Sequence, residues 1–306
     1  MPSRKEDPTG ELRQRVKASF NITKRLAKAQ GKVVKLFREI PTKIKHVQPA
    51  VNFQQTIYQL NAQQRQAFES NIELIVIEAL EVEAENMPPD FWWSDLLEQP
   101  FRKGSLEETN NIDLILGSAI LGFLLSPDTV LITEDFRTTL IEVQMANYGI
   151  MRRFARDTSK GITNNIMPLI EAGATKGEII AAIKKETRKS ARKGRLIAST
   201  EINKALSDAK LNIIKLANDK IDAKLLVLHR SALTPTTRDH HADRHGKIYT
   251  VEQQQRWWNT GANRINCKCS TTAVKLDRDP KKNKKVVKRQ QTMDKQKAAF
   301  FKEQDK

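Results

Sequence analysis

The sequence predicts an α+β fold, in which a mainly helical N-terminal region is followed by a small α+β module and both ends are basic and disordered. Three observations predict this fold class. Apolar residues recur at helical spacing through much of the chain, β-prone runs follow Asp219, and positive charge is concentrated at the two ends. A hydrophobic fraction of 39% and an aromatic fraction of 6% suit a helix-rich protein with solvated segments.

The N-terminal part is expected to contain a basic arm and three helices. Residues 1–48 are amphipathic and strongly basic, so we expect an arm that is frayed alone and helical only when bound. Apolar and acidic residues then mix at helical spacing until Pro88 and Pro89 end the pattern. The expected order is a helix in 71–85, a loop with short turns in 91–105, a second helix in 112–125 and a third in 134–156.

The α+β module is expected in residues 188–276. Its helix carries an apolar stripe with steps of three or four residues, made of Ala198, Ile202, Ala205, Ala209, Ile213 and Leu216. Short apolar or alternating runs at 225–229, 247–251 and 269–274 are expected to be strands. The tail beyond them has little to bury and is expected to be disordered or a charged helix. The expected domains are therefore 1–48, 49–187, 188–276 and 277–306.

The charge distribution favours a nucleic-acid partner. The chain has 53 Lys and Arg against 36 Asp and Glu, a formal charge of +17. Residues 1–50 carry 13 basic and 4 acidic side chains and residues 275–306 carry 12 and 5, whereas residues 69–113 carry 2 and 12. Such segregation indicates basic arms that contact phosphates without sequence preference. The candidate DNA contacts in the tail are Lys281, Lys282, Lys284, Lys285, Lys288 and Arg289.

Neither a signal peptide nor a membrane partner is expected. The chain starts with a polar segment that lacks the apolar core of a signal peptide. The most apolar run, residues 112–125, is shorter than the roughly 20 residues that a transmembrane helix needs. Cys267 and Cys269 are separated by one residue and cannot form the long-loop crosslink of a secreted domain, so we expect a reducing compartment, the cytoplasm.

Residues 236–250 contain three of the five histidines of the chain, together with two Asp and two Arg. Combined with the later thiols, His241, His245, Cys267 and Cys269 offer the donor set of a tetrahedral zinc site. However, C-x-C is a poorer chelate than C-x2-C, because residues two apart on a strand converge on one ion only where the chain turns. A hydrogen-bonded core with small apolar cysteines is therefore favoured over zinc, and no cofactor is expected.

Two enzymatic interpretations are weaker. A metal-dependent nuclease of the His-Asn-His type would need a further histidine after Asn263 or Asn266, and His245 is the last one. A cysteine nucleophile at Cys267 or Cys269 would need an oxyanion loop, and no Gly-rich turn accompanies the thiols. No catalytic residue is therefore expected, and a metal-dependent nuclease or another DNA-acting enzyme that uses the His/Cys cluster is kept as the alternative function.

Three motifs in the same order resemble the head-morphogenesis domain of the Mu F-like minor head proteins of tailed bacteriophages. They are RLIASTEINKALSDA (195–209), TRDHHADRHGKIYT (237–250) and INCKCS (265–270), and the resemblance covers about 188–274. Lys268 stands where the family has Arg, which keeps the charge and loses the planar fork. The matching positions are Arg195, Ile197, Ala198, Thr200, Glu201, Thr237, Arg238, His241, Gly246, Asn266, Cys267 and Cys269.

The resemblance implies a minor, non-enzymatic component of the phage head. Such a protein would be associated with the portal vertex or the head interior, after assembly in the host cytoplasm. Its partners would be the portal protein, the major capsid protein or a scaffold protein, and the packaged DNA. It also implies that the motif residues form a structural core, in which a carboxylate of Glu201 or Asp243 is expected to pair with Arg238. The members of this core are Arg195, Thr200, Glu201, Thr237, Arg238, His241, Gly246, Asn266, Cys267 and Cys269.

Overall fold

The computed structural model describes residues 11–48, 53–117, 130–131 and 133–304, which belong to two compact units. Among the described residues, the helical unit comprises 15–48, 53–94 and 144–198, and the sheet unit comprises 11–14, 95–117, 130–131, 133–143 and 199–304. Both units combine separate stretches of the chain, and helices α6 (Glu134–Glu171) and α7 (Lys176–Ile221) contribute to both. The domain limits expected from the sequence remain predictions.

The first helix is α1 (Glu11–Arg38), most of which belongs to the helical unit and where the sequence predicts a frayed arm. The prediction of disorder is wrong for these residues, because an apolar stripe gives the helix a face to bury. The stripe consists of the buried residues Ala18, Ile22, Leu26, Ala29, Val33 and Phe37. Helix α2 (Ala62–Leu80) follows, with a capping box formed by Asn61 and Gln64 at its start.

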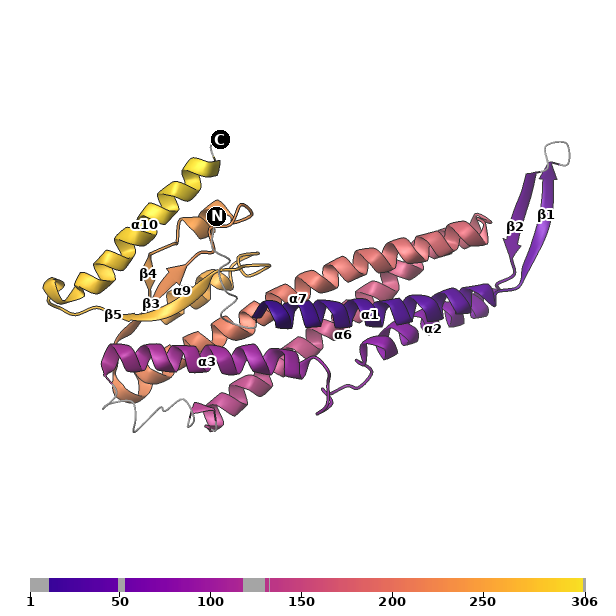
Figure 1. Cartoon of the computed structure of the whole chain (residues 1–306). Coiled ribbons are helices and arrows are strands. Elements are labelled where there is room, and N and C mark those ends of the chain that lie inside the picture. Colours follow the sequence, from indigo (N-terminus) through magenta and orange to yellow (C-terminus); the bar gives the residue numbers. More distant parts are fainter. Residues whose placement is uncertain (1–10, 49–52, 118–129, 132, 305–306) are drawn as a thin grey trace. The chain divides into compact units, whose positions relative to one another are not determined.

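Helices α1, α2 and the parts of α6 and α7 in this unit lie alongside one another (Figure 1). Helix α1 approaches α7 closely at Gly194, where an added Cβ would lie 2.5 Å from the Ile22 side chain. An ion pair of 2.6 Å between Lys32 and Glu78 links α1 to α2. The acidic residues of α2 thus complement a basic α1.

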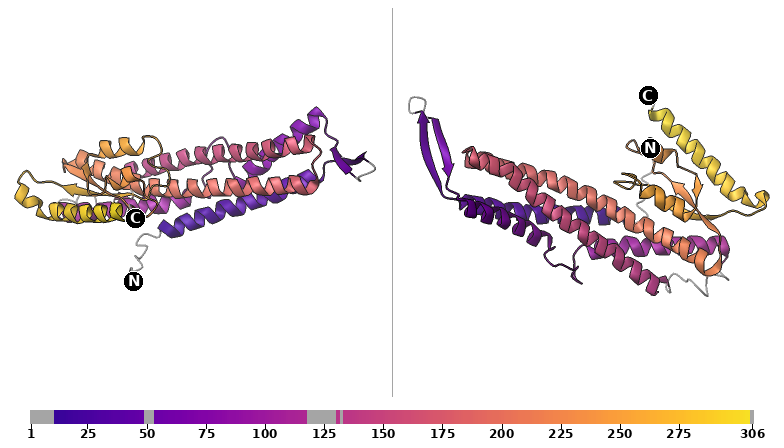
Figure 2. Two further views of the ribbon diagram at one scale, coloured as in Figure 1. Left: turned by 90° about the horizontal axis from the view of Figure 1, so that it is seen from above. Right: turned by 180° about the vertical axis from the view of Figure 1, so that it is seen from behind.

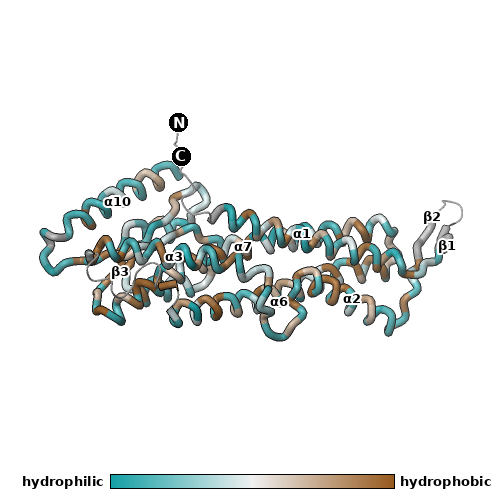
Figure 3. Tube along the Cα trace, turned by 60° about the horizontal axis from the view of Figure 1, so that its bottom comes forward, coloured by the Kyte–Doolittle hydropathy of each residue, from teal (hydrophilic) through white to brown (hydrophobic). Residues whose placement is uncertain are grey.

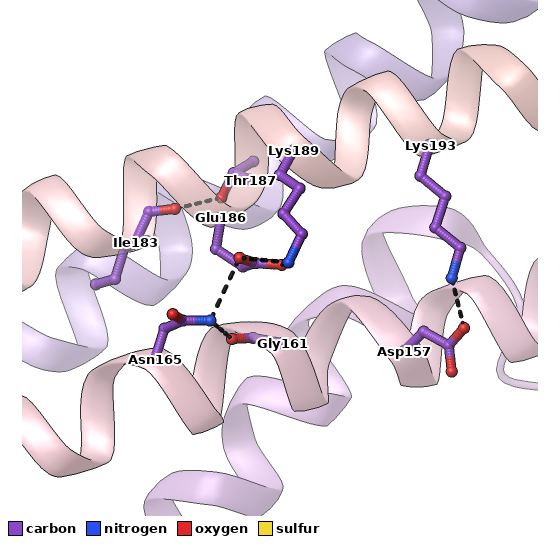
Figure 4. Close-up of polar contacts among 8 residues, drawn as sticks. All are labelled: Asp157, Gly161, Asn165, Ile183, Glu186, Thr187, Lys189 and Lys193. Atoms are coloured by element: carbon purple, nitrogen blue, oxygen red, sulfur yellow. Dashed lines mark hydrogen bonds and ion pairs between the residues drawn. The ribbon is translucent and has the colours of Figure 1, made fainter.

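Polar contacts join α6 to α7 in the same unit (Figure 4). Asn165 Nδ2 donates to the Gly161 carbonyl at 2.7 Å and to Glu186 Oε2 at 3.3 Å. Lys189 Nζ lies 3.3 Å from Glu186 Oε1, so the buried Glu186 carboxylate has two polar partners. Elsewhere along the same two helices, Lys193 of α7 forms an ion pair with Asp157 of α6 at 2.7 Å.

A β-hairpin stands between α1 and α2. Strands β1 (Thr42–Gln48) and β2 (Phe53–Tyr58) are antiparallel, with a register shift between His46 and Gln48. Figure 2 shows the hairpin beyond the end of α1. The sequence patterns do not predict it, because its strands are rich in Lys and Gln and lack a strong apolar alternation.

The sheet unit contains β3 (Leu225–Arg230), β4 (Ile248–Tyr249) and β5 (Ser270–Lys275) in the antiparallel order β4-β3-β5. Alternate residues point to opposite faces of the sheet. Val227 and the paired Ala273 pack with the second part of α7 and with Trp258 of α9 (Val251–Trp258). Of the apolar stripe that the sequence predicts on α7, Ala198, Ile202, Ala205, Ala209 and Ile213 are buried, and Leu216 is partly buried.

The opposite face of the sheet is covered by α10 (Lys284–Gln304), which follows the short 3-10 helix η2 (Pro280–Asn283). Met293 of α10 packs against Leu228 and Val274 of the sheet. Of the two expectations for the tail, the charged helix is confirmed and disorder is wrong for residues 280–304. Figure 3 shows α10 as a mostly hydrophilic helix, which explains why its small apolar contact is hard to recognise.

The other expected helices differ mainly in their limits. Helix α3 (Ser94–Leu116) occupies most of the segment expected to be a loop, because Leu96, Leu97 and Phe101 are buried. The second expected helix is described only as far as 117, and its remainder lies outside the described residues. The first expected helix lies largely within α2, and the third extends to Glu171 in α6.

No helix among the described residues is long and apolar enough to cross a bilayer.

Candidate functional site

The site lies in the sheet unit, where α8 (Asp239–Ala242) meets the segment that leads into β5. His241 Nδ1 lies 3.3 Å from Cys269 Sγ and 3.5 Å from Cys267 Sγ. All three side chains are buried, and their donor atoms lie within 4.8 Å of one another. The structure therefore brings together three of the four residues that the sequence predicts as zinc ligands.

Helix α7 holds the loop that carries the cysteines. Asn203 Nδ2 donates to the Cys267 carbonyl at 2.6 Å, and the Asn266 amide donates to Thr200 Oγ1 at 2.9 Å. Ser199 Oγ donates to Asn266 Oδ1 at 3.1 Å. Asn266 itself has a φ of 51°, in the left-handed region that Asn adopts more readily than most residues. The loop therefore turns at Asn266, directly before the first cysteine.

Arg238 fixes the same loop from the other side. Its guanidinium donates to the carbonyls of Ala262 at 2.7 Å, Asn263 at 3.0 Å and Ile265 at 3.1 Å. The sequence predicts a carboxylate partner for Arg238, and the observed partners are main-chain carbonyls instead. One planar fork of donors reaches three carbonyls within four residues of an irregular loop, which a single carboxylate contact would not do.

Next to this group lies a polar core around Trp257. His229 Nδ1 is 3.1 Å from Gln254 Oε1, and burial lowers the pKa of His229 to about 3. The Arg244 guanidinium lies 3.7 Å from the Tyr249 ring centre and 4.2 Å from that of Trp257. These contacts make a hydrogen-bonded and cation–π core beside the group of three donor atoms.

His245, the fourth predicted zinc ligand, lies apart from the group of three. Its Nδ1 is 3.1 Å from the Ser231 backbone, and its Nε2 is 3.1 Å from Gln296 of α10. Burial lowers the pKa of His245. Gly246 follows with a φ of 83°, and an added Cβ would lie 3.1 Å from Met293 Cβ. The left-handed turn at Gly246 thus directs the chain toward α10.

The two thiols are electrostatically unequal. Hydrogen bonds from Cys269 and His241 lower the pKa of the Cys267 thiol. The pKa of Cys269 is raised, first by its hydrogen bond to Cys267 and then by burial. A cavity of about 40 Å³ adjoins both cysteines and His241, and Ser231 and Thr237 are among its other lining residues.

The remaining predicted residues are distributed over both units. Thr237 Oγ1 accepts a hydrogen bond of 2.8 Å from the Thr234 amide, and Glu201 is buried 4.0 Å from Lys204 Nζ. Arg195 is exposed on the part of α7 that belongs to the helical unit. In the tail, Lys281, Lys284, Lys285 and Lys288 are exposed and Arg289 is half-buried, while the side chain of Lys282 lies outside the described residues.

Sequence reasoning missed Ser199 and Asn203, which contact the loop from one face of α7. They are four residues apart, and Asn203 is a buried polar residue next to the apolar stripe. A buried amide needs a hydrogen-bond partner, so its position in the helix is the signal that could have identified it.

Polar residues of α7 hold a Cys-x-Cys loop beside His241, and a small antiparallel sheet packs on the same helix. The sheet unit is therefore a small α+β module. The family model described as phage Mu protein F like protein matches residues 160–272. This part of the chain is therefore similar to the phage Mu F-like family, a phage head morphogenesis family. No curated protein and no solved structure shows significant similarity to the chain.

Proposed function

We propose that the chain is a minor structural protein of a phage head, which acts during head morphogenesis. The observation that carries this proposal is the family match over residues 160–272. The protein would reside at the portal vertex or in the head interior, and its protein partner would be the portal, the major capsid protein or a scaffold protein. Assembly would take place in the host cytoplasm.

The proposal includes no catalytic activity. The polar groups of Thr200, Asn203 and Arg238 hold main-chain atoms of the cysteine loop, which is the work of a structural motif. The cavity beside the thiols, about 40 Å³, is far smaller than the ~300 Å³ or more of ordinary ligand sites. Plasmid DNA incubated with the protein and Mg²⁺ or Mn²⁺ should stay intact, and cleavage that His241→Ala abolishes would favour the nuclease instead.

Contact with packaged DNA is the second part of the proposal. The first part of α7 exposes seven basic side chains within twelve residues: Lys184, Lys185, Arg188, Lys189, Arg192, Lys193 and Arg195. Exposed lysines in η2 and α10 add a second basic segment. Surfaces of this kind bind phosphates and do not read bases, so binding without sequence preference is expected.

Quantitative mass spectrometry of purified procapsids and DNA-filled heads tests the structural role. We expect a few copies per head in both particles, and chemical crosslinks to the portal, capsid or scaffold protein. Particles from a phage in which the gene is deleted are the control for contamination. Absence of the protein from both wild-type particles would contradict the proposal, whatever the result of DNA-binding assays.

A further inference from the structure

We propose that His241, Cys267 and Cys269 bind one zinc ion, with a water molecule in the adjoining cavity as the fourth ligand. This inference goes beyond the proposed function, because a structural role in the head does not by itself imply a metal. It rests on the positions of the three donor atoms, on the way the loop is held and on the cavity beside them.

The distances between the donor atoms are those of a tetrahedral zinc site. With zinc bonds of about 2.3 Å to sulfur and about 2.05 Å to nitrogen, a histidine nitrogen and a cysteine sulfur on one ion lie roughly 3.5 Å apart. The observed distances from His241 Nδ1 are 3.3 Å to Cys269 Sγ and 3.5 Å to Cys267 Sγ. Both nitrogen–sulfur distances therefore fit a zinc tetrahedron, and all three donor atoms lie within 4.8 Å of one another.

Hydrogen bonding alone does not account for this arrangement. A ring nitrogen carries either one proton or one lone pair in its plane, so Nδ1 can make one good hydrogen bond. Two sulfur atoms nevertheless lie within hydrogen-bond distance of His241 Nδ1. A cation among the three atoms would satisfy all of them at once, because each would direct a lone pair to the same point.

The chain geometry removes the objection to the C-x-C spacing. The left-handed turn at Asn266 precedes the first cysteine, and the Cys269 amide donates to Cys267 Sγ at 3.3 Å, so both sulfur atoms point to one side. The contacts of Asn203 and Arg238 then fix the loop in this form. Such outer contacts orient metal ligands, and an amide bonded to sulfur favours the thiolate that zinc requires.

The fourth position faces the cavity. Its volume of about 40 Å³ exceeds the roughly 10–15 Å³ that one water molecule needs. Ser231 is buried and lines this cavity, and its hydroxyl offers a hydrogen-bond partner to such a water. The His241 ring is held against Trp257, with ring centres 4.8 Å apart. The site is therefore shielded from bulk solvent, with three buried protein ligands and one water position.

Metal analysis of the full-length protein, purified without a histidine tag, tests the proposal. We expect about one zinc per chain in the wild type, and loss of zinc in Cys267→Ser and His241→Ala. The matched control is His240→Ala, because His240 is the exposed neighbour of His241 and contacts Asn263 at 3.0 Å. A wild-type protein that contains no zinc and takes up none when zinc is added would overturn the proposal.

Cobalt keeps the test decisive if the variants do not fold. Added to metal-free wild-type protein, Co²⁺ should give intense visible bands of tetrahedral coordination and a near-ultraviolet thiolate charge-transfer band, both saturating at one ion per chain. Zinc should displace it. Weak bands typical of octahedral cobalt, or a disulfide between Cys267 and Cys269 in protein kept free of oxygen, would contradict the site.

Discussion

At the residue scale, Arg238 holds the loop before the cysteines through three hydrogen bonds to main-chain carbonyls. Replacement by Lys keeps the charge and offers one point donor in place of a planar fork, so it cannot reach all three carbonyls. Loss of hydrogen bonds from a charged donor costs about 1–3 kcal/mol.

We therefore predict that Arg238→Lys speeds amide hydrogen exchange in residues 259–267 by roughly 5-fold to 100-fold, since 1.4 kcal/mol is a factor of ten. Exchange in α1 should stay unchanged. Arg256→Lys, at an exposed position of the neighbouring α9, is the control. Equal protection of the loop in both variants would show that the carbonyl contacts do not hold it.

His229 gives a prediction about pH. Because burial holds its folded-state pKa near 3, below the ordinary value of about 6.5, the unfolded chain binds the extra proton first as pH falls. The contribution of neutral His229 to stability is therefore complete above about pH 6.5 and declines toward pH 3. The loss approaches ~1.4 kcal/mol per pH unit for this one group.

Thermal unfolding at pH 7, 6 and 5 measures this effect. In His229→Asn, whose side chain can still donate to Gln254 Oε1 and does not titrate, the fall in melting temperature should be smaller than in the wild type. His240→Asn changes an exposed histidine and should leave the wild-type slope. Parallel curves for wild type and His229→Asn would contradict the assignment.

The sequence indicates the types of donor atom at the site better than it indicates which residues come together there. The two thiols and His241 are visible as a possible zinc set from residue type alone. The sequence spacing favours His245 as a ligand equally well. In the structure, however, the chain turns at Gly246 and His245 contacts Ser231 and α10 instead. The left-handed turns at Asn266 and Gly246 depend on the packing around them, so the spacing of residues in the sequence does not predict them.

At the element scale, α3 is joined to the sheet by a buried carboxyl group. Glu108 Oε1 accepts hydrogen bonds from the Ala273 amide at 2.6 Å and from Asn111 Nδ2 at 2.7 Å. Burial raises the pKa of Glu108. The folded state thus prefers the neutral acid, and this stability is complete below about pH 4.3 and is lost as pH rises.

Because both hydrogen bonds reach Oε1, Gln can replace Glu108 and place its amide nitrogen at the other oxygen position. We predict that Glu108→Gln raises the melting temperature at pH 7, by an amount equivalent to about 1 kcal/mol, and has little effect at pH 4. Glu142→Gln, at an exposed position of α6, should change neither value. Destabilisation at pH 7 would mean that charged Glu108 is compensated by Lys210, a nearby cation.

The two ends of the chain show why sequence patterns do not predict whether a basic segment is a packed helix. Helices α1 and α10 both carry strong positive charge, which indicates solvation, and both nevertheless bury a narrow apolar face. In α10 that face includes only Met293 and Phe300 as buried residues, seven positions apart. Two residues are too few to distinguish a docked helix from a disordered tail, because the sheet surface that receives them is unknown from sequence.

At the scale of the whole molecule, the structure changes how DNA contact must be tested. Removing the tail would also remove α10, and with it the cover of Leu228 and Val274. Lost DNA binding in such a truncation would then be confounded by exposed apolar surface. Neutralising exposed basic residues separates the two effects, because it leaves the buried contacts in place.

Two sets of Lys/Arg→Gln substitutions make this comparison. The tail set is Lys281, Lys284, Lys285 and Lys288, and the α7 set is Lys184, Lys185, Arg188 and Arg192, all exposed. Lys189 and Lys193 stay unchanged because they pair with Glu186 and Asp157. The matched control for the tail set carries Lys→Arg at the same four positions, which keeps every charge.

Each set that contacts phosphates should lower the slope of log affinity against log salt concentration, by about 3 to 4 when all four members bind. The slope follows from counterions released by the neutralised phosphates, so it should be the same for duplexes of different sequence. The Lys→Arg control should retain the wild-type slope. A reduction by one set alone would identify the segment that touches DNA. Wild-type affinity that does not change with salt would rule out the electrostatic contact for both segments, and leave the head-protein proposal to the particle analysis.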